Sequence, residues 1–572
     1  MKRKVLQIGI ASLIATATLG CDRKSQHVAS KEMIQKSQKH FADQLNRLKQ
    51  SGFDINATSD SSYILTIKDP NKASIQILSS IGMTAIDQKT KRELDKILDG
   101  SKIGIDINWT RYANMDANST FVYFLGSKQI DKAFEKIFKS KKLGAYIGFG
   151  KDDTIKTVFF KDIDEKVNKD HLQIKSLKAI AQNDSPNAFK IDAKKISMGF
   201  VQDGSTPVEV TFEKPSCDTD MQNRYLGKYS CIFPAISLNM NDSNKTLNAI
   251  LDDTRIDYNA KSKNNKVSTT MNMNIKDTKL DLKNGYADTS IKLNSIKLAL
   301  GSSDTNESII KEMIRVSKEK KDLNKSNIKM AELSGKMFEH MRLDYDISLD
   351  SVNFVSKGRK NSKQIDIKAF KQKGDLSFDQ TINTNDVTTL SSIKASDSLH
   401  PAPIFELKNL KSATGIRRLY NVLPEFMKIA ATSSSFNNSN KEEMTDEDIK
   451  KLASLAEKML NNGVSIYYKP ISVDEVSTEG KKYNKIILNL DANLTKNSIN
   501  LDNPMAQLLL LQYLQAGGRL VMYKKDLESM SKSFSPTMMA MVMMYAKYDG
   551  DKAIFEVKFE NGHLIINGKP LM

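Results

Sequence analysis

The stretch Ser290–Leu300, SIKLNSIKLAL, decides the fold class, because apolar and polar side chains follow one another in it with a period near two. This alternation is typical of a strand with one face on a core and the other in water. Similar short runs, divided by Asn, Asp, Gly and Lys turns, fill the chain from Phe53 onward and resume at Leu343. We therefore predict an α+β protein that is predominantly antiparallel β-sheet, elongated, with interspersed amphipathic helices.

Local sequence patterns predict particular helices and strands. Apolar residues in Ser30–Gln50 recur at helical spacing, which predicts a helix that packs on a domain or on a second copy of the chain. A second helix has Thr445 as its N-cap, acidic residues in its first turn and Gly463 after its end. Alternation from Ile486 predicts a strand, and the turn Asn561-Gly562 predicts a closing hairpin.

The chain of 572 residues is longer than one hydrophobic core usually serves, so more than one domain is expected. The predicted organisation is a lipoprotein signal peptide at 1–20, a linker and amphipathic helix at 21–52, a β-rich domain with a disulfide hairpin at 53–304, a helical segment with central strands at 305–400, and a C-terminal α+β domain at 401–572.

The first residues have the layout of a secretory signal, with a basic start, an apolar run and small residues at its end. The run Val5–Leu19 is shorter than the about 20 residues that a spanning helix needs. Thr18-Leu19-Gly20-Cys21 resembles the bacterial lipobox, although Thr18 stands where Leu is usual. We therefore expect palmitate or a similar acyl group on Cys21, with plain secretion or an uncleaved anchor as the alternatives.

The expected location is the cell envelope, where the lipid anchor would hold the chain on a membrane with the remainder facing the periplasm. Asp22 resembles the enterobacterial signal for retention at the inner membrane. That rule does not hold in all bacteria, so the inner and outer membranes both stay open.

Acylation of Cys21 would leave Cys217 and Cys231, which are 14 positions apart in the sequence. An exported chain with two remaining cysteines predicts a disulfide that closes a hairpin. The alternative is two free thiols in a reducing compartment.

The net charge of +18 first suggests a nucleic-acid partner. Only 13 of the 86 basic residues are Arg, whereas specific phosphate and base recognition favours Arg. The lysines are also interleaved with acidic residues. The charge pattern therefore favours a solvated surface, no nucleic acid, and weak attraction to anionic lipid headgroups.

Sequence motifs for catalysis are missing. The stretch GAYIGFGKDD lacks the first glycine of a phosphate loop, where Ala145 stands, and its Ser or Thr, where Asp152 stands. The six histidines are not at metal-ligand spacing, and H-E-x-x-H, G-x-S-x-G and CxxC do not occur. We expect no enzyme activity, no metal and no cofactor, although distant residues could still converge in the fold.

Two apolar segments near the C-terminus are candidates for a ligand groove. Met505–Leu514 is apolar nearly all round, and SPTMMAMVMMY contains five methionines in seven residues. Core packing is the favoured interpretation of the methionines, with a Cu(I) site as the alternative. The residues that would line such a groove are Leu508, Leu511, Met538, Met541 and Tyr545.

The C-terminal third has a helix, then NNGVSIYYKPISVDEVSTEGKKYNKIILNLDANL, LQAGGRLVMYKKDLESM and FENGHLIINGKPLM. Together with HFADQLNRLKQSGFDINATSDSSYILTI near the start, it resembles the YdgA-like family of bacterial envelope proteins. The resemblance covers about Phe41–Leu65 and Ser396–Met572, and it implies a periplasm-facing protein with no established enzymatic activity. The lipobox departs from the uncleaved membrane helix that is usual in that family.

The sequence thus predicts a non-enzymatic, lipid-anchored envelope protein that acts as a scaffold or binding module. Its partners would be the membrane and either envelope proteins or lipid, and a homo-oligomer is compatible with the sequence. A carrier of a lipid or other hydrophobic ligand in an apolar groove is the main alternative, and an enzyme of unrecognised type is the third.

Overall fold

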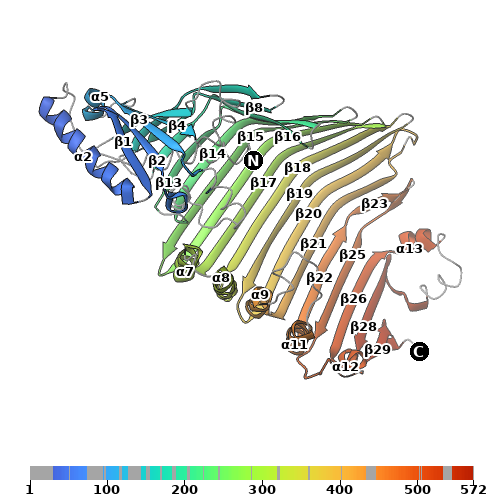
Figure 1. Ribbon diagram of the computed structural model, residues 1–572. Coiled ribbons are helices and arrows are strands. Elements are labelled where there is room, and N and C mark those ends of the chain that lie inside the picture. Colours follow the sequence, from blue (N-terminus) through green and yellow to red (C-terminus); the bar gives the residue numbers. More distant parts are fainter. Residues whose placement is uncertain are drawn as a thin grey trace. The chain divides into compact units, whose positions relative to one another are not determined.

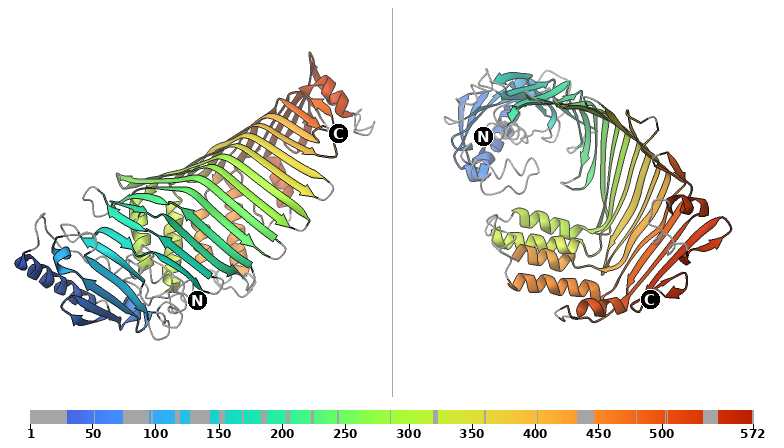
Figure 2. Two further views of the ribbon diagram at one scale, coloured as in Figure 1. Left: turned by 90° about the horizontal axis from the view of Figure 1, so that it is seen from above. Right: turned by 90° about the vertical axis from the view of Figure 1, so that its right-hand side faces the viewer.

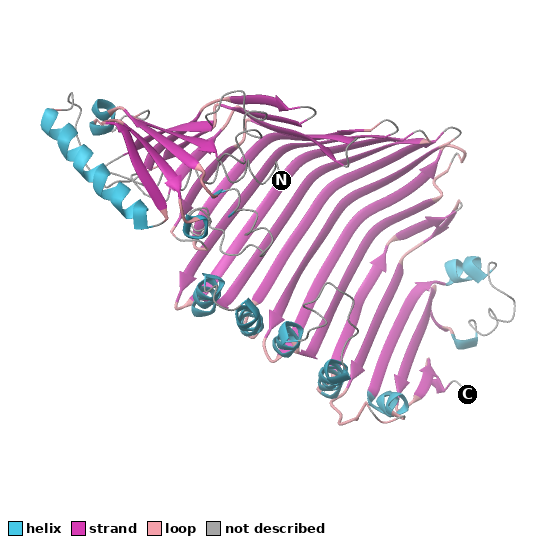
Figure 3. Cartoon of the chain, viewed as in Figure 1, coloured by secondary structure: helices cyan, strands magenta, loops and turns pink. Residues whose placement is uncertain are grey.

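A computed structural model shows that the chain is built mostly from antiparallel strands with a few helices, as predicted (Figure 3). The residues that the structure describes are 30–50, 52–73, 95, 98–114, 119–126, 143–149, 155–167, 170–182, 188–202, 206–222, 225–242, 245–284, 286–318, 323–358, 361–400, 402–432, 446–478, 480–501, 503, 505–531 and 544–570.

The chain divides into two compact units, Met1–Asn259 and Ala260–Met572. The division point falls within strand β15 (Lys245–Lys263). The finer domain boundaries expected from the sequence stay predictions.

Unit 1 is a set of short antiparallel strands, and each strand pairs mainly with neighbours close in sequence. The strands are β1 (Phe53–Ser59), β2 (Ser62–Ile67), β3 (Lys102–Ile107), β4 (Thr120–Gly126), β5 (Leu143–Phe149), β6 (Ile155–Phe160), β7 (Ile163–Val167), β8 (Asp170–Lys175), β9 (Lys178–Ala181), β10 (Ala188–Asp192), β11 (Lys195–Gln202), β12 (Thr206–Glu213), β13 (Ser216–Met221) and β14 (Gly227–Asn241).

The N-terminal helix of unit 1 packs on an aromatic cluster. Helix α2 (Lys31–Gln50) buries Phe41, Leu45 and Leu48. The Phe41 ring lies 5.5 Å from the ring of Tyr63 and 5.8 Å from that of Trp109, which begins helix α5 (Trp109–Ala113). Of the two predicted packing modes, the helix therefore uses the first, against its own domain.

The predicted disulfide is formed in unit 1. Cys217 in β13 lies directly opposite Cys231 in β14, and the two sulfur atoms are bonded. The bond closes the hairpin between these strands, as the sequence indicated.

Unit 2 contains one series of long antiparallel strands (Figure 1). Successive pairings join β16, β17, β18, β19, β20, β21, β22, β25, β26, β28, β29 and β30. The bounds are β16 (Lys266–Asn284), β17 (Ala287–Asn306), β18 (Arg342–Gly358), β19 (Ser362–Phe378), β20 (Thr381–Asp397), β21 (Phe405–Tyr420), β22 (Val464–Val473), β23 (Glu475–Thr478), β24 (Lys481–Tyr483), β25 (Ile486–Leu494), β26 (Leu514–Tyr523), β27 (Lys547–Asp549), β28 (Lys552–Glu560), β29 (His563–Ile566) and β30 (Lys569–Pro570).

Helices connect strands of unit 2, and the first four described ones lie within the curve of its sheet (Figure 2). The helices are α7 (Glu307–Lys318), α8 (Leu323–Met337), α9 (Leu423–Thr432), α11 (Asp446–Asn461), α12 (Ala506–Tyr513) and α13 (Lys524–Ser531). Helices α7, α8, α9 and α11 form a row in which each contacts the next. Phe338, directly after α8, packs its ring 5.4 Å from that of Phe378 at the end of β19.

Three local predictions in unit 2 agree with the structure. Helix α11 begins at Asp446 and is followed by Gly463 with φ +77°, while its predicted cap Thr445 lies outside the described residues. The strand predicted from Ile486 is β25. The closing hairpin joins β28 to β29 through Asn561 and Gly562, both with positive φ.

The long strands of unit 2 have one apolar and one polar face. In antiparallel pairs, residues that lie opposite each other point to the same face. The pairings place these residues on what we call the apolar face: Met271, Met273, Ile275, Ile296, Leu298, Leu300, Leu343, Ile347, Leu349, Phe370, Leu376, Leu390, Leu410, Ile416, Ile466, Ile471, Leu488, Leu490, Leu520, Phe555 and Val557.

A row of left-handed residues crosses the sheet of unit 2. Ser295 in β17, Ala369 in β19 and Asn409 in β21 have φ of 54°, 50° and 54°, and their registers align them in one row. Figure 1 shows these strands bending along their length. We call these three the kink residues.

The kink residues keep the apolar side chains on one face. Leu293 and Ile296 are three positions apart, so a regular strand would point them to opposite faces. A left-handed residue between them interrupts the regular alternation and returns both to the same face. Ile367 and Phe370 flank Ala369 with the same spacing.

We predict that replacing both disulfide cysteines, C217S with C231S, lowers the free energy of unfolding of unit 1 by about 3 kcal/mol, because the closed loop constrains the unfolded chain. Trp109 is the only tryptophan of the chain, so its fluorescence in a urea titration reports on unit 1. A reductant should shift wild type equally and leave the double variant unchanged. An unshifted midpoint would contradict a stabilising disulfide.

The kink residues predict opposite effects of glycine at two alanines. A369G should raise the free energy of unfolding by about 1 kcal/mol, because glycine removes the penalty of a left-handed Cβ residue. A299G, in a regular part of β17, should lower it by roughly 0.5–1 kcal/mol. Urea unfolding followed by circular dichroism measures the free energy of unfolding of both variants. Equal destabilisation would show that Ala369 has the regular strand conformation.

Candidate functional site

The apolar face of unit 2 is open to solvent over much of its area. Leu300, Ile365, Ile466, Tyr468 and Leu490 point to this face and are each 39 % to 43 % exposed. They lie on four different strands, β17, β19, β22 and β25. Monomeric proteins rarely leave a contiguous apolar surface of this kind open, so it is the first candidate for a binding surface.

The helices cover this face only at its margins. The row of helices α7, α8, α9 and α11 meets the sheet at the strand ends, where Phe338 packs on Phe378. At the C-terminal end, Leu527 of α13 forms a small core with Met522 and Ala553. Away from these margins the five residues named above stay accessible, whereas Ile275 and Leu390 on the same face are buried.

The opposite face carries polar and charged side chains. Its ion pairs join neighbouring strands: Lys371 and Asp346 are 3.8 Å apart, and Arg519 and Glu556 are 3.2 Å apart. A pocket of about 380 Å³ on this face is lined by four charged residues, Asp344, Lys371, Lys373 and Asp375, together with Asn385, Val387 and Thr389. Because charged side chains of this face form ion pairs between neighbouring strands, we interpret it as a solvated surface.

A polar patch interrupts the apolar face on its middle strands. It surrounds Gly374, and the registers of β19, β20 and β21 place its members together. The polar patch consists of Gln372, Thr384, Asp386, Thr388, Ser412 and Thr414. Apolar residues continue on the strands to either side of it, so the surface offers a polar centre with apolar flanks.

Asp386 is the one acidic member of the polar patch. Its Oδ1 atom is buried and has no hydrogen-bond partner in the described structure. Burial raises the pKa of this carboxyl above its ordinary value. A buried, unpaired carboxylate oxygen is costly, because it loses hydration without gaining a hydrogen bond.

Gly374 makes room for Asp386 and for Tyr345 on the other neighbouring strand. A Cβ atom at Gly374 would lie 2.3 Å from Asp386 Oδ1 and 2.7 Å from the Tyr345 hydroxyl oxygen. Both side chains therefore extend over the glycine from opposite sides. The Gln372 amide donates a 3.4 Å hydrogen bond to the same Tyr345 hydroxyl. No local sequence pattern indicates this cluster, since only the register of three strands assembles it.

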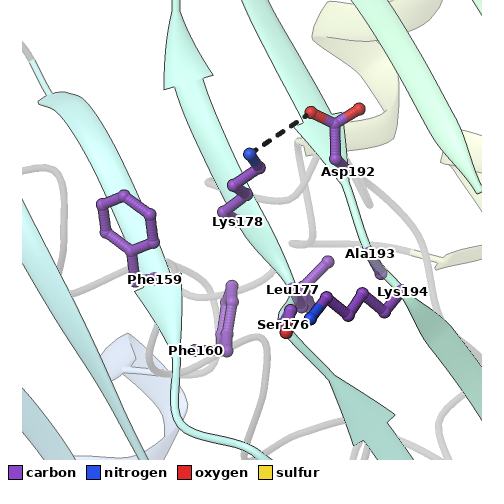
Figure 4. A pocket seen from close by; sticks show the side chains of 8 residues that line it. All are labelled: Phe159, Phe160, Ser176, Leu177, Lys178, Asp192, Ala193 and Lys194. Carbon is purple, nitrogen blue, oxygen red and sulfur yellow. Dashed lines mark ion pairs between the residues drawn. The ribbon is translucent and has the colours of Figure 1, made fainter. Parts of the chain in front are cut away.

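A second pocket, of about 500 Å³, lies in unit 1 between β6, β9 and β10 (Figure 4). Phe159 and Phe160 line one side. Lys178 and Asp192 lie 4.0 Å apart, and Asp192 also accepts a 2.5 Å hydrogen bond from the Ser216 hydroxyl. The Lys178 ammonium and the Asp192 carboxylate thus satisfy each other within the sheet, which favours a structural role.

The structure does not bring all the predicted groove residues together. Leu508 and Leu511 lie on α12, which precedes β26, and they are 56 % and 40 % exposed. The Tyr545 carbonyl accepts a hydrogen bond from the Asn567 side-chain amide, which also donates to the Ile554 carbonyl. Ile554 pairs with Val521, near the other end of β26. A strand of 10 residues, about 33 Å in length, separates the two places.

Other predicted site residues lie outside the described part of the chain. They are Cys21, Met538 and Met541. The acylation of Cys21 and the packing of the methionine-rich segment therefore stay predictions.

The described residues contain neither a metal-binding cluster nor a membrane-spanning helix. No three of their His, Cys, Asp or Glu side chains gather in a way that could hold a metal ion. No helix among them combines the length and apolar character needed to cross a membrane.

Comparison with known proteins does not assign the chain. No protein-family model matches it, and no curated protein is significantly similar to it.

Proposed function

We propose that unit 2 binds a membrane lipid on its apolar face and that the protein acts as a lipid-binding, lipid-anchored component of the cell envelope. The observation that carries this proposal is the open apolar face itself, with five large residues each 39 % to 43 % exposed. Of the functions expected from the sequence, this one is the hydrophobic-ligand carrier. The expected absence of enzyme activity stays a prediction.

The dimensions of the face suit an acyl chain. The row Ile275, Ile296, Leu349 and Phe370 runs across strands β16 to β19, and Leu390 and Leu410 extend it to β21. Six strands span roughly 24 Å at about 4.8 Å per step. The acyl chains of one bilayer leaflet span about 15 Å, half of the hydrocarbon core, so one chain fits across the row.

The energetics favour a lipid over an empty surface. Removing apolar surface from water contributes about 0.8 kcal/mol for each buried CH₂ group. An acyl chain on this face would bury both its own methylene groups and the exposed side chains beneath it. The polar patch on the same face gives a place for a polar headgroup, which a purely apolar ligand would leave unused.

The predicted anchor at Cys21 complements this function. An acylated Cys21 would keep unit 2 near a membrane that supplies lipid, and the excess of lysine would favour contact with anionic headgroups. A scaffold that binds another envelope protein on the same face is the rival interpretation. It predicts a protein partner and no bound lipid.

We predict that L490E lowers the amount of bound lipid about tenfold, because a carboxylate under an acyl chain is desolvated without a partner. V387E is the matched control, since Val387 is 44 % exposed but points to the polar face, while Leu490 is 40 % exposed. The full chain is incubated with phospholipid vesicles and reisolated, and its non-covalent lipid is quantified by mass spectrometry.

The proposal is wrong if wild type takes up no lipid, or if both variants lose it equally. Light scattering on the same samples measures whether a second copy of the chain covers the face instead. A lipid-free protein that forms a dimer through this face would overturn the lipid proposal.

The anchor makes a separate prediction. C21S should abolish incorporation of a radioactive fatty acid and move the protein from the membrane fraction to the soluble fraction, because the thiol is the expected attachment point. C217S with C231S is the control, since that pair forms the disulfide and should not affect labelling. Absence of label on the parent protein would refute the acylation of Cys21.

A further inference from the structure

The polar patch gives the proposed lipid site a preference for one kind of headgroup. We propose that Asp386, Tyr345 and Gln372, gathered over Gly374, bind the primary ammonium group of a membrane lipid whose acyl chains lie on the apolar face. This inference rests on the proposed function and deepens it, because it names the lipid class.

The first argument is the unpaired carboxylate oxygen. Asp386 Oδ1 is buried and makes no hydrogen bond in the described structure, and it faces the same surface as the apolar row. The group that best compensates a carboxylate in a partly apolar setting is a cation that also donates hydrogen bonds. A primary ammonium group combines a positive charge with three N–H donors.

The second argument is the set of neighbouring acceptors. The Tyr345 hydroxyl oxygen lies on the other side of the position that a Cβ of residue 374 would take, and Gln372 donates to that hydroxyl. The carboxylate oxygen and the hydroxyl oxygen both accept N–H donors, and the Gln372 amide, which donates to the hydroxyl through its nitrogen, carries a further acceptor oxygen. A quaternary ammonium group has the same charge but no N–H, so it could not satisfy Asp386 Oδ1.

The third argument is the glycine. A Cβ at position 374 would collide with both Asp386 Oδ1 and the Tyr345 ring. Elsewhere on this face the neighbouring strands carry large apolar residues, such as Leu300 and Leu490 in the same cross-strand row. The glycine therefore leaves the space in which an acid and a tyrosine converge.

The experiment compares two zwitterionic lipids that differ only in the nitrogen. The full chain is incubated with vesicles of equimolar dioleoyl phosphatidylethanolamine and dioleoyl phosphatidylcholine and is then reisolated, and the bound lipids are quantified by mass spectrometry. Both lipids have no net charge, so the basic character of the protein does not bias the ratio. We expect wild type to favour phosphatidylethanolamine about tenfold, as for a hydrogen bond to a charged group.

D386N should reduce this preference to nearly one while total bound lipid stays substantial. D375N is the matched control, because Asp375 is the residue next to Gly374 and points to the polar face, where it accepts a hydrogen bond from Asn385. Its lipid ratio should equal that of wild type. G374A should lose the preference in the same way as D386N.

The outcomes separate this inference from the proposed function. If wild type binds both lipids equally, or if D386N keeps the preference, the headgroup site is refuted while lipid binding stands. If no lipid binds to any variant, the proposed function fails first. A urea titration of D386N checks folding, and a midpoint at or above that of wild type is expected, because the substitution removes the charge of a carboxylate whose buried Oδ1 has no hydrogen bond. A large drop would instead assign Asp386 a structural role.

Discussion

Every strand of unit 2 must keep its apolar side chains on the same face as those of its neighbours. A slip of one residue in any strand would move its whole apolar set to the polar face. The antiparallel register meets this demand over ten successive strands, and the kink residues Ser295, Ala369 and Asn409 maintain it where the strands bend. The left-handed conformation is unfavourable for residues with a Cβ. Its use at three aligned positions shows how strongly the single apolar face constrains this sheet.

A sheet with one apolar face usually buries that face under a second layer. Here the helices cover only the margins, and residues such as Leu300 and Leu490 keep two fifths of their surface in contact with water. The stability of unit 2 must therefore rest on the long hydrogen-bonded strand pairs and on the small cores at the strand ends. The partly exposed apolar side chains, such as Leu300 and Leu490, are where a ligand can supply the missing contacts.

The elements with local signals could be predicted from the sequence. Alternation indicated the strands, capping residues indicated α11, and Asn561-Gly562 indicated the last hairpin. The change of phase in SIKLNSIKLAL was also visible, since Leu293 and Ile296 are an odd number of positions apart, but its meaning depends on a left-handed Ser295. The site around Asp386 could not be predicted, because Tyr345, Gly374 and Asp386 come from three strands and meet only through their register.

The polar patch explains why the apolar face is not uniformly apolar. If its only role were to cover a core, the row through Tyr345, Gly374 and Asp386 would be expected to carry leucine or valine, as its outer strands do. A carboxylate with an unpaired buried oxygen lowers the stability of the ligand-free sheet. We interpret this carboxylate as part of a binding site in which the ligand supplies the missing hydrogen bond. Unfavourable local features in folded proteins concentrate where ligands are recognised. The same strands thus provide an apolar surface for acyl chains and one defined place for a polar group.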